Sequence, residues 1–319
     1  NYYKNKSAEK LARMFCKTTG FEKVFFTNSG AEAVELSIKA ARKYSGKTNI
    51  ISLVNAFHGR TYGAMSASFN EAKKEGFGPF LEDFSFAEKD IASIEEKITP
   101  NTAAVIIEPI QGAEGVNFLG FKFLYDLKQL CLKHNILLIV DEIQTGMGRC
   151  GKLFCYEYAK IMPDIVLSSK GIASGFPFGA VLTSKGIASK MTIATHGGTF
   201  NANLLGVAAA IATLKKINSK KVLANAKEMG EILEIGLREL KSHFPSVVEE
   251  IKGYGLMRGI KINSKFNAKE VMLRLTKEQN LLVGVAGGNI IKITPPIIIK
   301  EKDLKIGIIK IKNLFNTLR

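Results

Sequence analysis

Two side chains of opposite charge each follow a short apolar run in this sequence. Residues 136–140 lead directly into Asp141, and the run that begins at Ile165 ends in Lys170. In an open α/β sheet, ligands bind beyond the carboxyl ends of the strands, so we expect both side chains to face one crevice. A lysine can bind pyridoxal phosphate covalently, and a carboxylate can keep the pyridine nitrogen of that cofactor protonated. The pair therefore indicates a pyridoxal-phosphate enzyme.

Taken singly, each of these two residues also has a structural explanation. An aspartate at a strand end often caps the following helix, and an isolated lysine is usually a solvated surface charge. The prediction of a cofactor therefore depends on further motifs that indicate the same ligand.

A phosphate-binding turn is predicted after the short apolar run 24–26. Ser29 and Glu32 form the S-x-x-E pattern of a capping box at the start of a helix that runs through Tyr44. The unpaired amides and the positive dipole end of such a helix can bind a phosphate. Any capped helix after a strand gives this pattern, so it supports a phosphate site only in combination with Lys170 and Asp141.

An aromatic ring and an arginine follow the next apolar run, residues 50–53. The Phe57 ring could cover one face of a cofactor ring, and the Arg60 guanidinium could bind a substrate carboxylate with two hydrogen bonds. A core phenylalanine and a surface ion pair explain these residues equally well when the segment is considered alone.

Alternating apolar strands and helical segments predict an α/β fold with a mostly parallel, buried sheet. After residue 217 the sequence changes to charged amphipathic helices and shorter strands, and residues 253–259 and 290–296 read as turns and edge strands. We therefore expect a large cofactor-binding domain over residues 1–217 and a smaller α+β domain over residues 218–319. Further elements expected in the large domain are a strand over 103–107, a helix over 121–134, a Gly-rich loop over 195–200 and an apolar helix over 204–217.

The composition fits a cytoplasmic enzyme. The 319 residues are 46% hydrophobic, but they contain no run of eighteen apolar residues and do not begin with a secretory signal. The four cysteines lack metal-binding spacing, so free thiols are expected and no metal site is. His58 and His196 stand in Gly-rich loops, which suits a ligand site better than a metal cluster. The net charge of +16 could indicate nucleic-acid binding, but a solvated surface of scattered lysines explains it better.

Together these motifs closely resemble the class III, pyridoxal-phosphate-dependent aminotransferases, and among them most closely the acetylornithine aminotransferases. The resemblance extends from Tyr2-Tyr3 to the end of the sequence. Its motifs are Asn28-Ser29-Gly30-Ala31-Glu32-Ala33, Phe57-His58-Gly59-Arg60-Thr61, Glu108-Pro109-Ile110-Gln111-Gly112, Asp141-Glu142-Ile143-Gln144-Thr145-Gly146-Met147-Gly148-Arg149, Ser168-Ser169-Lys170, His196-Gly197-Gly198-Thr199 and Pro295-Pro296.

The resemblance implies aminotransferase fold type I and a set of cofactor-binding residues. Lys170 would hold the cofactor covalently and then move a proton. Asp141 would contact the pyridine nitrogen, and Gln144 would contact the phenolic oxygen. The remaining contacts implied are ring stacking by Phe57 and phosphate binding by the backbone amides of Gly30 and Ala31.

The resemblance also implies a homodimer and a substrate class. Thr199 would reach the phosphate of the neighbouring subunit's cofactor, while Arg60, Gly198 and Lys292 would lie on the substrate side. The implied reaction moves the δ-amino group of N-acetylornithine to 2-oxoglutarate. It gives glutamate and the semialdehyde, and it belongs to arginine biosynthesis.

Three departures from the family pattern bear on the substrate. Ala113 stands where the family has a glutamate, with Glu114 one position later. Lys292 stands where an arginine binds the substrate α-carboxylate, and a lysine cannot form the same two-pronged contact. Gly198 replaces a serine, and the residues after Thr199 replace a Gly-rich stretch. Relatives also begin some tens of residues earlier, so we expect that the family's N-terminal segment is missing here.

Three alternatives stay open from the sequence alone. An aminotransferase for ornithine, succinylornithine or 4-aminobutyrate would use the same residues. An aminomutase or racemase of the same fold would keep the cofactor without the transfer. A cofactor-free binding protein of the same fold would use the positive charge, but it would leave Asp141, Gln144 and Lys170 unexplained.

Overall fold

The computed structural model describes residues 4–318 and divides them into two compact units. Unit 1 holds the described residues of 4–109, 119–147 and 156–216, and unit 2 holds those of 110–118, 148–155 and 217–318. Unit 2 thus includes two loops that precede the predicted boundary after residue 217, and the domain assignment itself stays a prediction. Tyr2 and Tyr3, where the family resemblance begins, lie outside the described residues.

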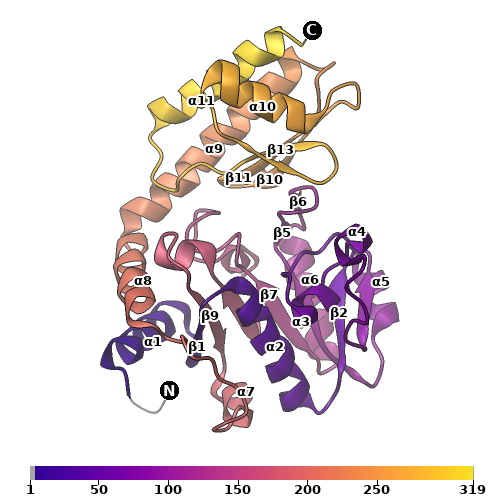
Figure 1. The fold of residues 1–319 in the computed structure, drawn as a ribbon, viewed down its shortest axis with the longest axis vertical. Helices are drawn as coiled ribbons and strands as arrows, with labels where there is room; N and C mark the ends of the chain where they lie inside the picture. The colour runs from indigo at the N-terminus through magenta and orange to yellow at the C-terminus, as the bar shows by residue number, and fades with distance from the viewer. Residues whose placement is uncertain (1–3, 319) are drawn as a thin grey trace. The chain divides into compact units, whose positions relative to one another are not determined.

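Unit 1 is built on a seven-stranded sheet, which confirms the predicted α/β fold with a mostly parallel sheet (Figure 1). β9 is antiparallel to both of its neighbours, β1 and β8, whereas all other neighbouring strands are parallel. In spatial order the strands are β1 (Lys23–Thr27), β9 (Gly179–Thr183), β8 (Ile165–Ser168), β7 (Leu137–Asp141), β4 (Thr102–Ile107), β2 (Asn49–Leu53) and β3 (Phe84–Ala87).

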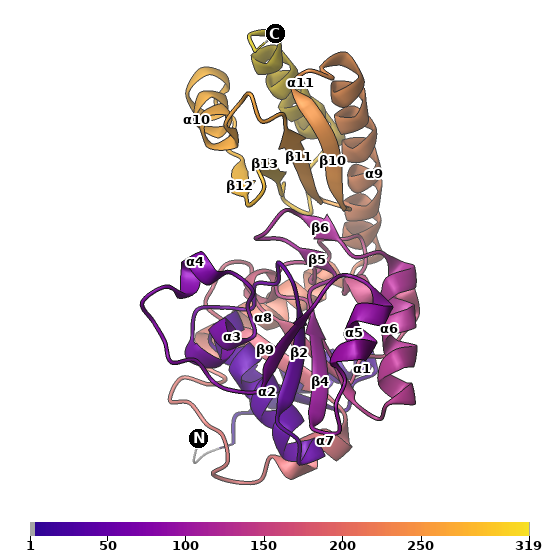
Figure 2. The ribbon, with the colours of Figure 1, turned by 90° about the vertical axis from the view of Figure 1, so that its right-hand side faces the viewer.

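Helices cover both faces of this sheet, with α2 on one face and α5 and α6 on the other (Figure 2). The predicted apolar side of α2 is buried, since Ala33, Leu36, Ala40 and Ala41 are at most 4% exposed. The helices are α1 (Lys6–Thr19), α2 (Gly30–Ser45), α3 (Tyr62–Ser66), α4 (Glu71–Lys74), α5 (Ile91–Lys97), α6 (Phe121–Lys133), α7 (Lys185–Lys190) and α8 (Leu204–Ile217), with 3-10 turns η1 (Cys155–Ala159) and η2 (Lys170–Ala173).

The strand register brings polar residues of three neighbouring strands to one edge of the sheet. Ile107 of β4 pairs with Val140 of β7, and Asp141 of β7 pairs with Leu167 of β8. Because these strands are parallel and end level with one another, the residues that follow β4 and β8 lie beside Asp141. β8 itself ends at Ser168, and Lys170 begins the turn η2.

Unit 2 contains a four-stranded antiparallel sheet that packs its apolar side chains against helices. The prediction of edge strands at 253–259 and 290–296 is wrong for β11 and β13, which are the two inner strands. Ile260 and Ile291 explain this, because both are fully buried in the core that α9 helps to form. The elements are β5 (Ile110–Gln111), β6 (Asn117–Phe118), α9 (Lys220–His243), β10 (Val248–Tyr254), β11 (Met257–Ile262), α10 (Ala268–Gln279), β12 (Gly284–Ala286), β13 (Ile290–Ile293) and α11 (Glu301–Asn316).

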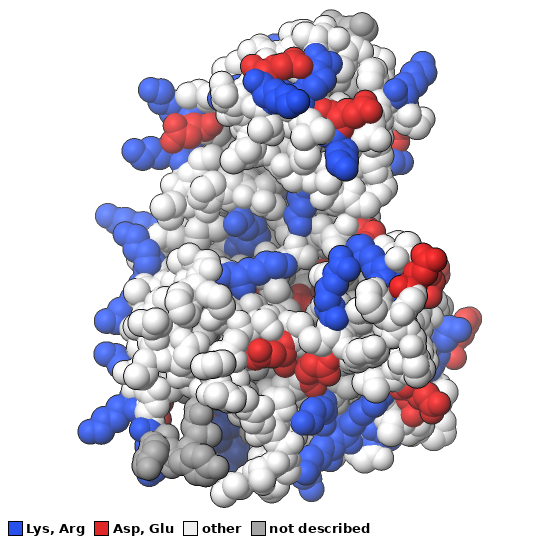
Figure 3. All heavy atoms as spheres, in the orientation of Figure 1, with Lys and Arg blue, Asp and Glu red and all other residues white. Residues whose placement is uncertain are grey.

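Charged side chains are spread over both units. Figure 3 shows Lys and Arg side chains scattered over the visible face, and no single patch gathers them. Within residues 4–318, no helix combines the length and the apolar character needed to cross a membrane.

Candidate active site

The turn between β1 and α2 presents two backbone amides that the helix does not use. Ser29 caps α2 by accepting a hydrogen bond from the Glu32 amide (3.2 Å), as the capping box predicts. The Glu32 carboxylate, however, accepts from the amide of Asn28 (2.8 Å) instead of that of Ser29. The first intrahelical bond runs from Ala33 N, so the amides of Gly30 and Ala31 have no acceptor within the helix.

Gly30 allows this turn to approach the segment that follows β7. A Cβ atom at Gly30 would lie 2.8 Å from Cδ1 of Ile143 and 3.1 Å from its Cγ2. Glycine at this position therefore lets the start of α2 close over the chain beyond Asp141, with its free amides beside the cavity.

The Asp141 carboxylate is buried and held by two partners. One oxygen accepts a hydrogen bond from the amide of Ile143 (3.0 Å), and the other lies 2.8 Å from Nδ1 of His58. Asp141 is 4% exposed and His58 is 3% exposed. Burial acts to lower the pKa of His58, but the hydrogen bond and charge of Asp141 outweigh burial, with help from Glu108, and raise that pKa. The Asp141 carboxylate therefore favours the protonated form of the His58 imidazole.

The Lys170 amine is suited to act as a nucleophile. Its side chain is accessible from the cavity but is largely surrounded by protein, and this desolvation lowers its pKa although the charges of Asp141 and Glu108 oppose the effect. The backbone of Lys170 has a φ of +45°, a left-handed conformation that a non-glycine residue adopts only when its surroundings hold it there. Ser169 contributes to that hold, because its hydroxyl donates to the carbonyl of Phe178 (2.7 Å).

Glu108 is a second buried carboxyl group beside Lys170. It follows β4 directly, and its Oε2 accepts a hydrogen bond from the amide of Phe57 (2.9 Å). Burial raises its pKa to about 7, and the charges of His58 and Asp141 act in opposite directions on it. This group therefore exchanges its proton in the neutral range while it fixes the backbone of Phe57.

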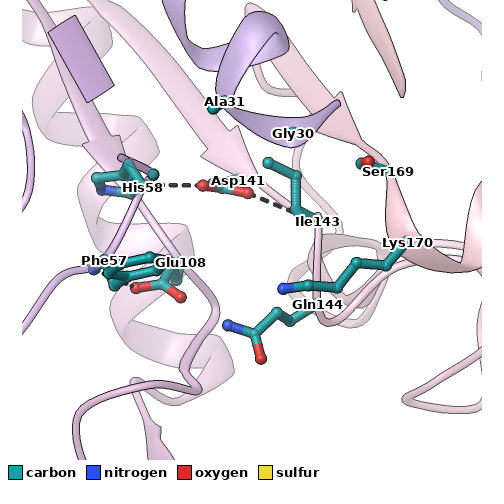
Figure 4. Close-up of a pocket in the computed structure, with 11 residues that line it drawn as sticks. Gly30, Ala31, Phe57, His58, Glu108, Asp141, Ile143, Gln144, Ser169 and Lys170 are labelled. Carbon is teal, nitrogen blue, oxygen red and sulfur yellow. Dashed lines mark hydrogen bonds and ion pairs between the residues drawn. The ribbon is translucent and has the colours of Figure 1, made fainter. Parts of the chain in front are cut away.

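These side chains surround one cavity of about 170 Å³ within unit 1 (Figure 4). In Figure 4, Lys170 and Gln144 reach into the cavity from one side, and Phe57 and Glu108 lie opposite them. The structure thus brings together six residues that the sequence predicted, namely Gly30, Ala31, Phe57, Asp141, Gln144 and Lys170. The remaining lining residues are His58, Gly59, Glu108, Ile143 and Ser169.

Four predicted residues do not line this cavity. Arg60 is exposed, and its guanidinium lies 6.0 Å from the centroid of the Phe57 ring. Gly198 and Thr199 lie in an exposed loop of unit 1. Lys292 lies in unit 2, where its ammonium donates to the carbonyl of Gly112 (2.8 Å).

From the sequence, His58 was expected only to lie near a ligand site, without a specific role, and Glu108 was given no role. Glu108 could have been found, because it follows a buried apolar strand as Asp141 does. His58 gave a weaker signal, since its Nδ1 contact to Asp141 joins residues 83 positions apart. A third missed side chain is Lys73, whose ammonium lies 5.3 Å from the centroid of the Phe57 ring.

Comparison with known proteins identifies the family. The model of the family "Aminotransferase class-III" matches residues 1–315. The chain belongs to the class III aminotransferases. An acetylornithine aminotransferase of Agrobacterium fabrum is 40% identical over 98% of this chain and 79% of its own length.

Two solved structures show the same fold. The ornithine aminotransferase of Toxoplasma gondii superposes with a TM-score of 0.94 at 31% identity, covering 99% of this chain and 77% of that one. The acetylornithine aminotransferase of Elizabethkingia anophelis gives 0.85 at 32% identity, covering 99% and 79%. These relationships confirm the predicted fold type, the aminotransferase activity and the cofactor pyridoxal phosphate.

The cavity of unit 1 has the donor set that this cofactor requires. It combines a lysine of lowered pKa, a buried carboxylate held by an imidazole, two free helix-start amides and one aromatic ring. When bound, pyridoxal phosphate supplies an electron sink for the charge that develops on the carbon beside the amino group. An amino donor and a 2-oxo acid are the two substrates of such an enzyme.

Proposed function

We propose that this aminotransferase moves the δ-amino group of N-acetylornithine to 2-oxoglutarate, giving glutamate and the semialdehyde of arginine biosynthesis. One observation carries the chemistry: Lys170, with its lowered pKa, shares a cavity with the buried, His58-bound Asp141. The choice of amino donor rests on relatives named acetylornithine aminotransferase, such as that of Agrobacterium fabrum, which is 40% identical.

We assign the cofactor contacts to the residues around the cavity. Asp141 would bind the pyridine nitrogen, and His58 orients the Asp141 carboxylate through the 2.8 Å contact with its Nδ1. The amides of Gly30 and Ala31 bind the phosphate, as the start of α2 allows. Gln144 contacts the phenolic oxygen.

Lys170 holds the cofactor and moves the proton at the reacting carbon. Its lowered pKa leaves more of the amine neutral at neutral pH, which favours both nucleophilic attack and proton abstraction. Glu108 fixes the Phe57 backbone, so the Phe57 ring would cover one face of a bound cofactor, and Glu108 can hold a proton close to the Lys170 amine.

We place the substrate carboxylates at the cationic surroundings of Phe57. The Arg60 guanidinium and the Lys73 ammonium lie 6.0 and 5.3 Å from the centroid of that ring. Either cation, and Arg60 by a two-pronged contact, can bind a carboxylate. Lys292 is a further substrate-side residue by family resemblance, and its contact with Gly112 O implies that binding a carboxylate must compete with this hydrogen bond. At Gly198, no side chain is available to contact the substrate.

We also propose a homodimer in which Thr199 reaches the phosphate of the neighbouring subunit's cofactor. The loop around Thr199 and the start of α8 expose large apolar side chains that a second subunit would cover, since Ile193 is 99% exposed, Phe200 72% and Leu205 71%. Sedimentation of the protein should show twice the monomer mass, and a monomer would contradict this assembly. A cytoplasmic location is proposed because all four cysteines are free thiols.

Ornithine is the second candidate for the amino donor. The ornithine aminotransferase of Toxoplasma gondii superposes on this chain with a TM-score of 0.94. The departures at Ala113, Gly198 and Lys292 also alter positions that bear on the substrate in the family. Succinylornithine and 4-aminobutyrate are weaker candidates, because only the shared chemistry supports them.

A donor comparison tests the proposal. The purified protein with pyridoxal phosphate and 2-oxoglutarate is given N-acetylornithine, ornithine, N-succinylornithine or 4-aminobutyrate, and glutamate formation is measured. We expect kcat/KM for N-acetylornithine to exceed the others by about tenfold or more, equivalent to about 1.4 kcal/mol. Faster use of another donor would replace N-acetylornithine, and isomerised donor without glutamate would indicate a mutase or racemase.

A further inference from the structure

Three asparagines join the loop that bears Thr199 to the phosphate-binding turn. The side-chain amide of Asn28 donates to Oδ1 of Asn201 (3.1 Å), and that of Asn203 donates to Oδ1 of Asn28 (3.4 Å). Asn28 also donates to the Glu32 carboxylate from its side chain (3.1 Å) and its backbone (2.8 Å). Asn28, Asn201 and Asn203, here called the amide cluster, thus connect residues 173 to 175 positions apart.

In this loop the Asn201 side chain is buried, whereas the tip of the loop is exposed to solvent. The amide of Asn201 donates to the carbonyl of Gly198 (3.2 Å), so residues 198–201 form a turn with Thr199 and Phe200 at its tip. Asn201 is 9% exposed, whereas Phe200 is 72% exposed and Thr199 is exposed as well. The buried side chain of Asn201 therefore holds in place the turn that exposes Thr199.

The loop backbone does not favour this shape by itself. Ala202 has a φ of +57°, a left-handed conformation that glycine adopts readily and alanine does not. A loop with an alanine in this conformation depends on side-chain contacts to stay in place. The contact of Asn201 with Asn28 supplies such a restraint, one residue away from the strained position.

We propose that Asn201 is a positioning residue that sets the affinity for the cofactor's phosphate by fixing Thr199 relative to the phosphate-binding turn. The inference rests on the proposed function, in which Thr199 reaches the phosphate of the neighbouring subunit's cofactor. Asn28 immediately precedes Ser29 and the free amides of Gly30 and Ala31 in its own subunit. The amide cluster therefore connects the phosphate-binding turn of one subunit to Thr199, which would contact the cofactor phosphate in the neighbouring subunit.

Cofactor binding with and without the phosphate tests this role. Dissociation constants of pyridoxal phosphate and of pyridoxal are measured by visible absorbance for the wild type and for Asn201→Ala. Loss of the hydrogen bond between Asn28 and Asn201 should weaken pyridoxal phosphate binding about five- to tenfold. Pyridoxal has no phosphate, so its dissociation constant should not change.

Two further variants make the result specific to Thr199. Asn5→Ala is the control for the loop, because the Asn5 side chain donates to the carbonyl of Ala202 (3.3 Å). Asn5 also caps α1 by accepting from the amides of Ser7 and Ala8, so this variant also reports the effect of a loss of stability outside the amide cluster. It should leave the preference for pyridoxal phosphate over pyridoxal unchanged. In the background of Thr199→Ala, adding Asn201→Ala should have no further effect, since the two residues act through one contact.

Several results would overturn the inference. If Thr199→Ala weakens pyridoxal phosphate binding but Asn201→Ala binds it as the wild type does, Thr199 contacts the phosphate and Asn201 does not position it. An equal loss of pyridoxal and pyridoxal phosphate binding in Asn201→Ala would mean that the side chain only stabilises the fold. If Asn201→Ala does not fold, Asn201→Ser is measured in its place with the same criteria. None of these measurements uses an amino donor, so they stand even if N-acetylornithine is not the substrate.

Discussion

The buried carboxyl group of Glu108 makes stability depend on pH in a way that one substitution should remove. Burial raises its pKa from 4.5 to about 7 in the folded protein. Between these pH values the folded protein keeps the Glu108 proton and the unfolded chain releases it. Stability due to this group is therefore present at pH 4.5 and is lost as the pH rises to about 7. At 1.36 kcal/mol per pKa unit, the loss is about 3 kcal/mol.

Glu108→Gln should abolish this loss, because glutamine does not titrate and its side-chain oxygen can still accept from the Phe57 amide. For a unit of this size, 1 kcal/mol corresponds to roughly 2–4 °C in the thermal midpoint. The thermal midpoint of the variant minus that of the wild type should therefore increase by roughly 6–12 °C when the pH is raised from 5 to 8. Both proteins are measured without pyridoxal phosphate, because bound cofactor would add its own stabilisation.

A difference in midpoint that stays constant from pH 5 to pH 8 would refute this reasoning about Glu108. His58 also has a raised pKa, so its contribution is present at low pH and is lost as the pH rises through its folded pKa. Both proteins keep His58, so most of this effect cancels in the comparison. Glu35→Gln is a matched carboxylate-to-amide control, because Glu35 also accepts backbone hydrogen bonds, from Gly63 (2.8 Å) and Ala64 (3.2 Å).

Three further substitutions test the site. Lys170→Ala should abolish turnover while circular dichroism stays native, and near-normal glutamate formation would exclude Lys170 as the catalytic residue. His58→Ala should remove one of the two partners of the buried Asp141 carboxylate, leaving only the Ile143 amide, and lower kcat about 10- to 100-fold, so wild-type kcat would show that the His58 contact is dispensable. Lys292→Arg should lower the KM for 2-oxoglutarate through a two-pronged carboxylate contact, and an unchanged or higher KM would count against a substrate-side role.

The architecture of unit 1 could be predicted because its signals are local and consistent. The strands before Asp141 and Lys170 are short apolar runs, and parallel strands bring their carboxyl ends to one edge. The register Ile107↔Val140 and Asp141↔Leu167 then brings Glu108 to the same place. The inner position of β11 in unit 2 was missed, because strand order depends on long-range pairing that a short segment does not encode.

The electrostatics of the site could not be read from the sequence in the same way. The His58–Asp141 contact depends on the path of the loop after β2, and the pKa of Glu108 depends on burial by several elements. The capping box was predicted from Ser29 and Glu32, yet Glu32 accepts from the amide of Asn28, whose side chain also donates to Asn201 in a distant loop. These hydrogen-bond partners and this pKa depend on contacts between residues that are distant in the sequence.

Visible absorption of the protein with pyridoxal phosphate tests both the role of Lys170 and the proposed amino donor. We expect a band of the cofactor bound at Lys170 that disappears when N-acetylornithine is added and returns, with glutamate, when 2-oxoglutarate follows. The same band should be missing from Lys170→Ala. A band that N-acetylornithine leaves unchanged would contradict the proposed substrate, and the same band in Lys170→Ala would contradict the assignment of the site.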